Sequence, residues 1–179
     1  MEAADQVAYV AFDTETNGLD AEAGIISIAL AAFSVEGKCI GIWKSFVKQS
    51  SVGRTDIHGI TLEMLESAPT FGEIYREFLD RTYGRIVIAH NAEFDNRMIA
   101  QEIARIGAPL PSWKLGCTLK LSRRLLRSPS YKLLNCRQAV GLGGYNAHDA
   151  ADDAVACGEL FHELFKKWGS GRSMLEFIS

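Results

Sequence analysis

The chain has 179 residues, of which 47% are hydrophobic and 23% are charged, and its formal net charge is −3. This length and composition are typical of one globular domain with an ordinary core. No apolar run approaches the roughly 18 residues that a membrane span needs, and the N-terminus lacks the basic region of a signal peptide. We therefore expect a cytoplasmic protein with no membrane association.

The first fifty residues predict three consecutive antiparallel strands. A short apolar, β-prone run ends directly before Asp13. Two further β-prone runs are separated by Glu36-Gly37, a dipeptide that favours a hairpin turn. The expected strands are residues 7–12, 25–35 and 38–47.

The remainder of the chain predicts helices and one further strand. Thr61 and Thr70 can cap helices that follow the polar loop at residues 49–59. The order of the elements indicates an α/β fold, a mixed sheet flanked by helices, with a single domain at residues 1–168 and a C-terminal extension or linker at residues 169–179. Helices are expected at residues 62–67, 71–81, 92–106, 114–126, 133–140 and 150–167, and a strand at residues 85–89.

A basic stretch interrupts this otherwise acidic chain. From residue 103 to residue 148 there is no Asp or Glu, and eight cations give the stretch a local charge of +8. Segregated charge of this kind favours a polyanionic partner such as nucleic acid. The cations are Arg105, Lys114, Lys120, Arg123, Arg124, Arg127, Lys132 and Arg137.

Two carboxylates stand at the end of the first strand. Asp13 and Glu15 are two residues apart, so they project from the same face of a strand. Neighbouring carboxylates repel each other, and near a core they are costly without a cation. A divalent metal removes that conflict, and oxygen ligands favour Mg²⁺ or Mn²⁺.

Two later segments carry further candidates. Asp95 lies in the first turns of the helix that follows a buried strand. His148 precedes the long last helix, and Asp153 lies one turn inside it. A histidine can act as a general base near neutral pH, because its unperturbed pKa is near 6.5.

The three segments together resemble the motifs of the DEDDh exonucleases, the DnaQ-like group of the RNase H-like superfold. The segments are F-D-T-E-T-N-G-L, H-N-A-E-F-D and H-D-A-A-D-D, and I-H-G-I at residues 57–60 is also similar. The resemblance covers residues 7–165. Within this family, the chain is similar to exonuclease domains of the DNA polymerase III epsilon type. It implies a five-stranded mixed sheet with helices on both sides.

The resemblance also implies roles for individual residues. Asp13, Glu15, Asp95 and Asp153 match the four metal-binding acids, and His148 matches the general base. A 3′→5′ exonuclease that acts on single-stranded or frayed DNA would follow, with two Mg²⁺ or Mn²⁺ ions and nucleoside 5′-monophosphates as products. The implied substrate-binding residues are Thr16, Leu19 (a wedge against the terminal bases), Ile57, His58, Asn91 and Phe94. Backbone phosphates would contact Lys120, Arg123, Arg124, Arg127 and Lys132.

Other functions remain open at this stage. A ribonuclease of the same family, trimming RNA 3′ ends or short oligoribonucleotides, would use the same residues. A non-catalytic nucleic-acid-binding module would be indicated by a lost metal ligand, and a small-molecule phosphohydrolase would leave the basic stretch without a role. A polymerase or another replication or repair protein is a possible partner, although nothing after Ser170 resembles a polymerase-binding tail. Cys117 departs from the family, whose members often carry an acid there.

Overall fold

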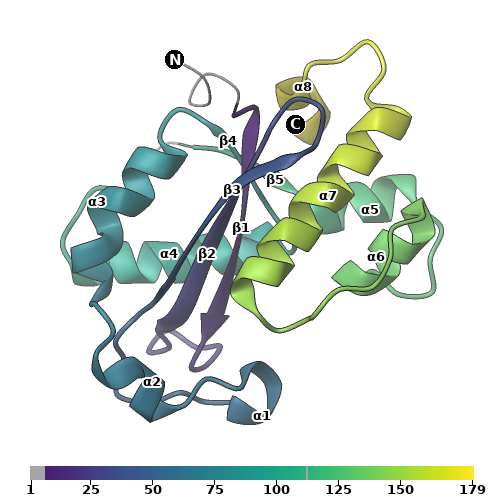
Figure 1. The fold of residues 1–179 in the computed structure, drawn as a ribbon. Helices are drawn as coiled ribbons and strands as arrows, with labels where there is room; N and C mark the ends of the chain where they lie inside the picture. The colour runs from purple at the N-terminus through teal and green to yellow at the C-terminus, as the bar shows by residue number, and fades with distance from the viewer. Residues whose placement is uncertain (1–6, 112) are drawn as a thin grey trace.

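A five-stranded mixed sheet forms the centre of the molecule, in the order β3-β2-β1-β4-β5 (Figure 1). The structure is a computed structural model that describes residues 7–111 and 113–179. Strands β1, β2 and β3 are antiparallel neighbours, and β4 and β5 continue the sheet in parallel to β1. This arrangement confirms the predicted fold class. The strands are β1 (Tyr9–Thr16), β2 (Ile25–Phe33), β3 (Cys39–Phe46), β4 (Ile86–Ala89) and β5 (Lys114–Cys117).

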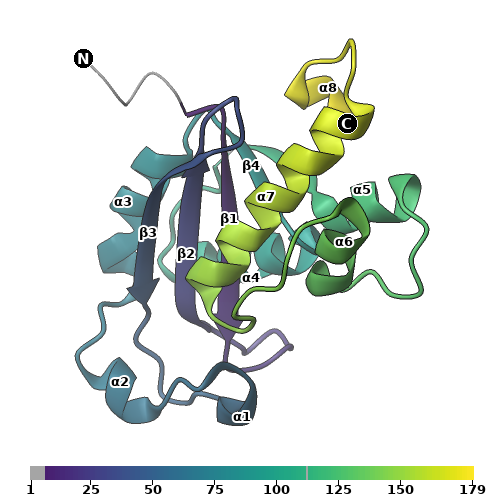
Figure 2. The same cartoon turned by 45° about the vertical axis from the view of Figure 1, so that its right-hand side comes forward.

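Helices cover both faces of the sheet (Figures 1 and 2). Alternate residues of β1 divide between two cores: Tyr9 and Ala11 pack with α5, α6, α7 and α8, whereas Val10 and Phe12 pack with α3 and α4. The helices α1 and α2 lie beyond one end of the sheet. The bounds are α1 (Thr55–His58), α2 (Leu62–Glu66), α3 (Phe71–Thr82), α4 (Ala92–Arg105), α5 (Thr118–Leu125), α6 (Leu133–Val140), α7 (Ala150–Trp168) and α8 (Met174–Ile178).

The sequence prediction was wrong for the beginning of residues 114–126. Residues Lys114–Cys117 form strand β5, and the helix α5 begins only at Thr118. Pairing with β4 overrides the local helical pattern, since Gly116 lies opposite Ile88 in the parallel ladder. A Cβ at Gly116 would lie 2.6 Å from Cδ1 of Ile88, so glycine allows this close approach. The polar loop predicted at residues 49–59 likewise contains the short helix α1.

The segment after residue 168 packs against the domain. Helix α8 follows the N-cap Ser173, which forms a capping box, and places Phe177 in the core, where this residue is 1% exposed. Phe177 contacts the rings of Phe161 and Phe165 of α7. The predicted extension therefore contributes to the same core as the sheet. Residues 1–6 of the predicted domain lie outside the described residues, and no described helix has the length and apolar character to cross a membrane.

Candidate active site

The end of β1 presents two carboxylates toward α7. Asp13 and Glu15 follow the buried run Tyr9–Phe12 and alternate with Thr14, which is buried on the other side. The ladder between β1 and β2 is interrupted after Glu15 by a bulge. Irregularities of this kind commonly redirect side chains next to functional sites.

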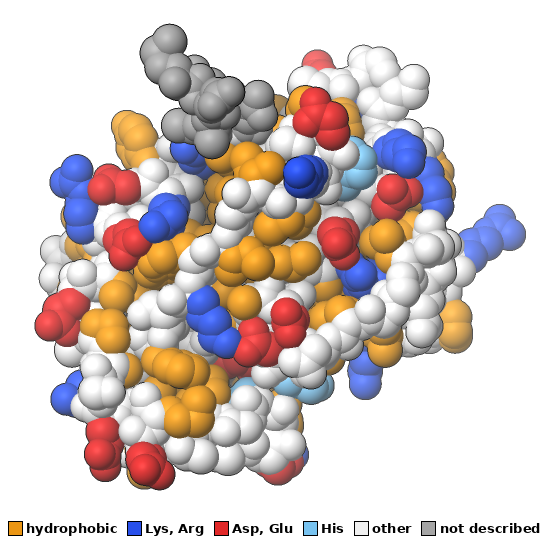
Figure 3. All heavy atoms as spheres, viewed as in Figure 1, with side chains coloured by type: hydrophobic (Ala, Val, Ile, Leu, Met, Phe, Trp, Pro, Cys, Tyr) orange, Lys and Arg blue, Asp and Glu red, His pale blue; other side chains and the backbone are white. Residues whose placement is uncertain are grey.

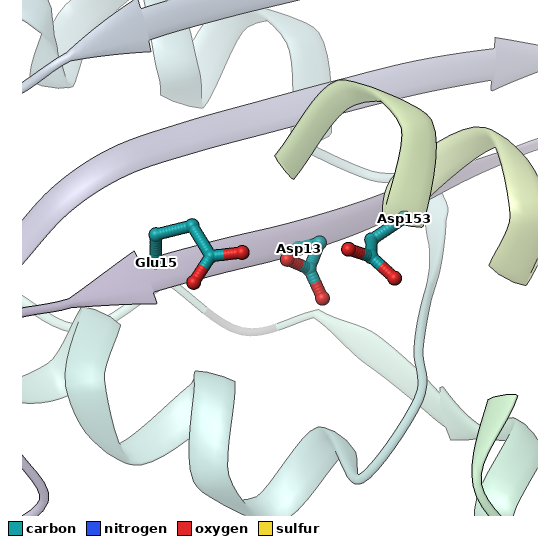
Figure 4. Close-up of side chains that lie close together, drawn as sticks. All are labelled: Asp13, Glu15 and Asp153. Atoms are coloured by element: carbon teal, nitrogen blue, oxygen red, sulfur yellow. The ribbon is translucent and has the colours of Figure 1, made fainter. Parts of the chain in front are cut away.

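Helix α7 supplies a third carboxylate to the same place. Asp149 caps the helix by accepting hydrogen bonds from the backbone N–H groups of Ala151 and Asp152. Asp153 lies one turn further along and points toward β1 (Figure 4). One carboxylate oxygen from each of Asp13, Glu15 and Asp153 lies within 4.8 Å of the others. We call these three residues the acid trio.

Asp95 lies beside the acid trio and approaches from the opposite face of the sheet. The last paired residues of β4 and β1 are Ile88 and Ala11, so β1 continues past its parallel neighbour. Asn91, with a left-handed backbone at φ 66°, begins α4 there. The buried Asp95 then accepts a 2.8 Å hydrogen bond from the hydroxyl of Thr14. The fourth predicted acid is therefore adjacent to the trio and held by β1 itself.

Burial and mutual repulsion disfavour the charged forms of these acids. Burial raises the pKa of Asp13 well above its ordinary value, and the neighbouring carboxylates of Asp95 and Asp153 raise it further. Burial raises the pKa of Glu15 to about 7, again with contributions from nearby acids. The pKa of Asp95 is also raised to about 7 by burial, against the hydrogen bond from Thr14. A cluster of this kind favours a cation among its oxygens.

Asp153 is held by two residues that precede α7. The phenol of Tyr145 donates a 2.6 Å hydrogen bond to Oδ1, and the backbone N–H of His148 donates a 2.7 Å bond to Oδ2. His148 has a left-handed backbone at φ 70°, and its side chain is exposed. Its side chain lines a small cavity that also contains Glu15 and His58. The predicted general base is therefore brought next to the acids.

Strand β3 contributes a cation to the rim of the site. Nζ of Lys44 lies 2.5 Å from Oδ2 of Asp149 and lowers the pKa of Glu15, opposing the effect of burial. Figure 3 shows acidic, cationic and histidine side chains gathered where the N-terminal end of α7 meets the sheet. The edge strand is thereby tied to the helix that carries Asp153.

A cavity of about 290 Å³ opens beside Glu15. Most of the residues predicted to bind substrate line it together: Thr16, Leu19, Ile57, His58 and Phe94. Asn91 is the exception, because it lies at the start of α4 and outside this lining. The cavity is also lined by Thr14, Asn17, Gly18 and Arg54. We call it the apolar pocket.

His58 lines both cavities and is held by two hydrogen bonds to the backbone. Its Nδ1 accepts a hydrogen bond from the backbone N–H of Ile60, so the proton resides on Nε2 and is donated to the carbonyl of Val52 at 3.0 Å. Both ring nitrogens are thereby used within the protein. His58 shapes the pocket by its position, and the exposed ring of His148 has the freedom that a general base needs.

Comparisons with known proteins agree with this geometry. The model of the RNase_T family, described as exonuclease, matches residues 10–161. The chain belongs to this exonuclease family. Its family and fold identify it as a nuclease, and the resemblance stated from the sequence is confirmed.

Relatives of this RNase_T exonuclease differ greatly in length. DNA polymerase III subunit epsilon of Treponema pallidum is 34% identical over 164 residues, which cover 88% of this chain and 76% of that protein. The PolC-type DNA polymerase III of Thermotoga petrophila is 33% identical over 174 residues, covering 92% of this chain. The chain spans only 12% of that relative's length. The solved structure of Exonuclease X, in complex with 5′ overhanging duplex DNA, has a TM-score of 0.76 and 25% identity, covering 96% of this chain and 99% of that chain.

The cations of this exonuclease occupy several environments. Within the basic stretch, Lys120 pairs with Glu93, Arg105 with Glu102, and the buried Arg137 with Glu159. Arg124 donates to the carbonyl of Phe177 beside a cavity at the C-terminal helix. Arg123, Arg127 and Lys132 are exposed. Part of the predicted +8 charge is thus neutralised within the protein, although all five predicted phosphate contacts are exposed, Lys120 and Arg124 included.

Sequence reasoning missed Tyr145, Lys44 and Arg54. Tyr145 lies eight residues before Asp153 in a turn-rich segment and belongs to no motif. Lys44 belongs to an edge strand whose partner Asp149 is 105 residues away. Arg54 precedes the short helix α1, which was predicted as loop. The sequence shows only that these three residues are charged or phenolic. It does not show which residues they contact in the fold.

Proposed function

We propose that this chain is a metal-dependent 3′→5′ exonuclease that removes nucleotides one at a time from the 3′ end of DNA. One observation carries the proposal: Glu15 belongs both to the acid trio and to the lining of the apolar pocket. A terminal nucleotide in that pocket would have its phosphodiester beside the acids. The products would be nucleoside 5′-monophosphates.

The donor set fits divalent cations. The acid trio offers only oxygen atoms, which Mg²⁺ and Mn²⁺ prefer, and Asp95 lies next to it as the fourth expected ligand. Burial and the neighbouring carboxylates raise the pKa of Asp13, and bound dications would offset the repulsion among these acids. When bound, two such ions would activate a water molecule and stabilise the departing 3′ oxygen.

The protein's own residues would perform the remaining steps. The imidazole of His148 would accept the proton of the attacking water, since the residue is exposed beside Glu15 and histidine is the side chain that most often serves as a general base. Tyr145 would keep Asp153 oriented by its hydrogen bond. The ring of Phe94 and the aliphatic side chain of Ile57 would contact the faces of the terminal base, which allows any base to bind.

The size of the pocket suits one nucleotide. Its volume of about 290 Å³ is near the lower limit for small-ligand pockets, roughly 300–1,000 Å³. DNA is favoured as the substrate because two similar proteins are named as DNA polymerase III components and the structure of a third is a complex with DNA. The polymerase context of these relatives also makes a replication polymerase a reasonable partner to test.

The test is a cleavage assay on 5′-labelled single-stranded DNA and RNA of the same sequence, with Mg²⁺ or Mn²⁺ and an EDTA control. We expect a ladder that shortens from the 3′ end of DNA, and its loss in Asp153→Asn, which removes a ligand charge at nearly constant volume. Asp152→Asn is the matched control, because Asp152 is exposed on the same helix and outside the trio. Faster shortening of RNA would assign the ribonuclease function instead. Full activity in Asp153→Asn would refute the proposed site.

A further inference from the structure

Leu19 is the most prominent apolar residue at the rim of the apolar pocket. Its side chain is 75% exposed, and it lies in the turn that joins β1 to β2. Single exposed aliphatic residues are common on protein surfaces. What distinguishes Leu19 is the number of hydrogen bonds that hold the backbone beneath it.

One side of α4 binds the carbonyl groups of this turn in succession. Arg97, Gln101 and Arg105 are spaced by four residues, so they follow one another along the same side of the helix. Nη1 of Arg97 donates to the carbonyl of Leu19 at 3.1 Å. Nε2 of Gln101 donates to Asp20 and Ala21, and Nη2 of Arg105 donates to Ala21, Glu22 and Ala23, at distances between 2.8 and 3.4 Å. We call these three side chains the α4 clamp.

The clamp rests on a buried acid. Glu102 is 4% exposed, and its Oε1 accepts hydrogen bonds from Nη1 of Arg105 at 3.0 Å and from the backbone N–H of Ile25 at 2.9 Å. Nε2 of Gln49 donates to the same oxygen at 2.9 Å. Arg105 is therefore fixed at the inner end of the row, where the turn enters β2. The turn is held from its base to Leu19.

Arg97 connects two walls of the apolar pocket. Its guanidinium lies 5.3 Å from the ring centroid of Phe94, while Nη1 bonds the carbonyl of Leu19. Leu19 and Phe94 both line the pocket but come from different elements. Arg97 thereby couples the position of the exposed Leu19 to the position of the ring that would contact the terminal base.

We infer that the α4 clamp holds Leu19 as a rigid wedge, and that this rigidity determines how well the protein acts on a paired 3′ end. The inference rests on the proposed function. Taking a terminal nucleotide out of a base pair costs free energy, because the base must be unpaired and unstacked. If the turn were mobile, Leu19 would be displaced when it meets the duplex. If the turn is held by the clamp, Leu19 keeps its position and separates the terminal base pair. A single-stranded 3′ end needs no such force.

The experiment compares two substrates that share one 3′ sequence, a single strand and a blunt duplex, in the presence of Mn²⁺. The variants are Arg97→Ala, Gln101→Ala and the double variant, with Leu19→Ala as the wedge control. Arg76→Ala serves as the charge-matched control, since Arg76 is an exposed arginine on α3. Arg97→Lys tests rescue, because it keeps the positive charge and a nitrogen that can donate a hydrogen bond.

We expect the duplex rate of the double variant to fall about tenfold more than its single-strand rate, as displaced positioning groups commonly cause losses of this size or larger. The ratio of duplex rate to single-strand rate should fall equally in Leu19→Ala. It should be intermediate in Arg97→Lys and unchanged in Arg76→Ala. Equal losses on both substrates would overturn the inference, and so would an unaltered protein that cleaves only the single strand. If the unaltered protein cleaves neither substrate, the proposed function itself fails.

Discussion

The hydroxyl of Tyr145 donates a 2.6 Å hydrogen bond to Oδ1 of Asp153. The backbone N–H of His148 occupies Oδ2 of the same carboxylate at 2.7 Å. Both oxygens are thus oriented by the segment that precedes α7. These hydrogen bonds lower the pKa of Asp153, but burial, which is the larger effect, leaves it above its ordinary value.

Tyr145→Phe should weaken metal binding more than it slows the chemical step. The change removes one hydrogen bond from Asp153 and keeps the aromatic ring that stacks near Arg137. Loss of a group that orients a ligand commonly costs about 10–100-fold in metal affinity or activity. The measurement is cleavage rate against Mn²⁺ concentration, where we expect a shift of the midpoint to higher concentration. An unchanged midpoint would show that Tyr145 has no part in orienting Asp153.

His148→Asn should lower kcat while leaving binding of a single strand nearly intact. Asparagine accepts the left-handed backbone at φ 70° better than alanine does, so the hydrogen bond of the backbone N–H to Asp153 is kept. Loss of a general base typically reduces the rate by about a hundredfold or more. Single-turnover cleavage at pH 7 measures the rate, and binding in Ca²⁺ provides the control. A rate equal to that of the unaltered protein would exclude His148 as the base.

The metal-free protein should lose thermal stability as the pH rises from about 6.5 to 8. The pKa values of Glu15 and Asp95 are raised to about 7, whereas in the unfolded chain both lie near 4. The folded state therefore binds more protons in this range, and its stability falls as they are released. Burial lowers the pKa of His90, so this residue makes the folded state more stable as the pH rises. That contribution is confined to pH values below about 6.5, the ordinary pKa of histidine.

Thermal unfolding in EDTA at the two pH values tests this expectation. Adding Mn²⁺ at pH 8 should raise Tm, because an ion that binds only the folded state stabilises it. Asp95→Asn should flatten the pH dependence, since it removes one of the titrating carboxylates. A Tm that rises with pH in EDTA would contradict the electrostatics described for the site.

Arg127→Ala with Lys132→Ala should reduce the salt dependence of DNA binding. Both residues are exposed, and each phosphate contact with a single strand contributes about 0.7 to the slope of log K against log salt. Lys120→Ala should change the slope less, because Lys120 already pairs with Glu93 at 2.5 Å. Fluorescence anisotropy at several salt concentrations gives the slopes. Identical slopes for the unaltered protein and the double variant would remove these two cations from the binding surface.

The sequence was sufficient to predict the three antiparallel strands and β4, and the resemblance of its motifs to an exonuclease family implied the five-stranded sheet and the convergence of the acids. Asp13 and Glu15 lie at the end of an apolar run, and Asp153 lies just inside a long amphipathic helix. Such patterns can be read from the sequence because they involve residues that are close together in the chain. They identify which side chains stand at the ends of elements, whereas the expectation that these side chains meet came from the resemblance to the exonuclease family.

The parts that could not be predicted depend on distant contacts. The strand β5 has four residues and contains Gly116, and only its ladder with β4 distinguishes it from the start of α5. The α4 clamp is equally invisible in the sequence. Arg105 appears there as one cation of a basic stretch, although its partners are carbonyl groups about eighty residues earlier in the chain.

The central position of β1 has a consequence for the order in which the protein folds. Its antiparallel neighbours form through local hairpins, but the bond between Thr14 and Asp95 spans 81 residues, and the bond between Tyr9 and Gly158 of α7 spans 149. Closing long loops is entropically costly and slows the formation of such contacts. We therefore expect the acids to come together late, when the chain is nearly native. If so, divalent ions should slow unfolding, because they stabilise only the native site. They should leave the rate of refolding nearly unchanged.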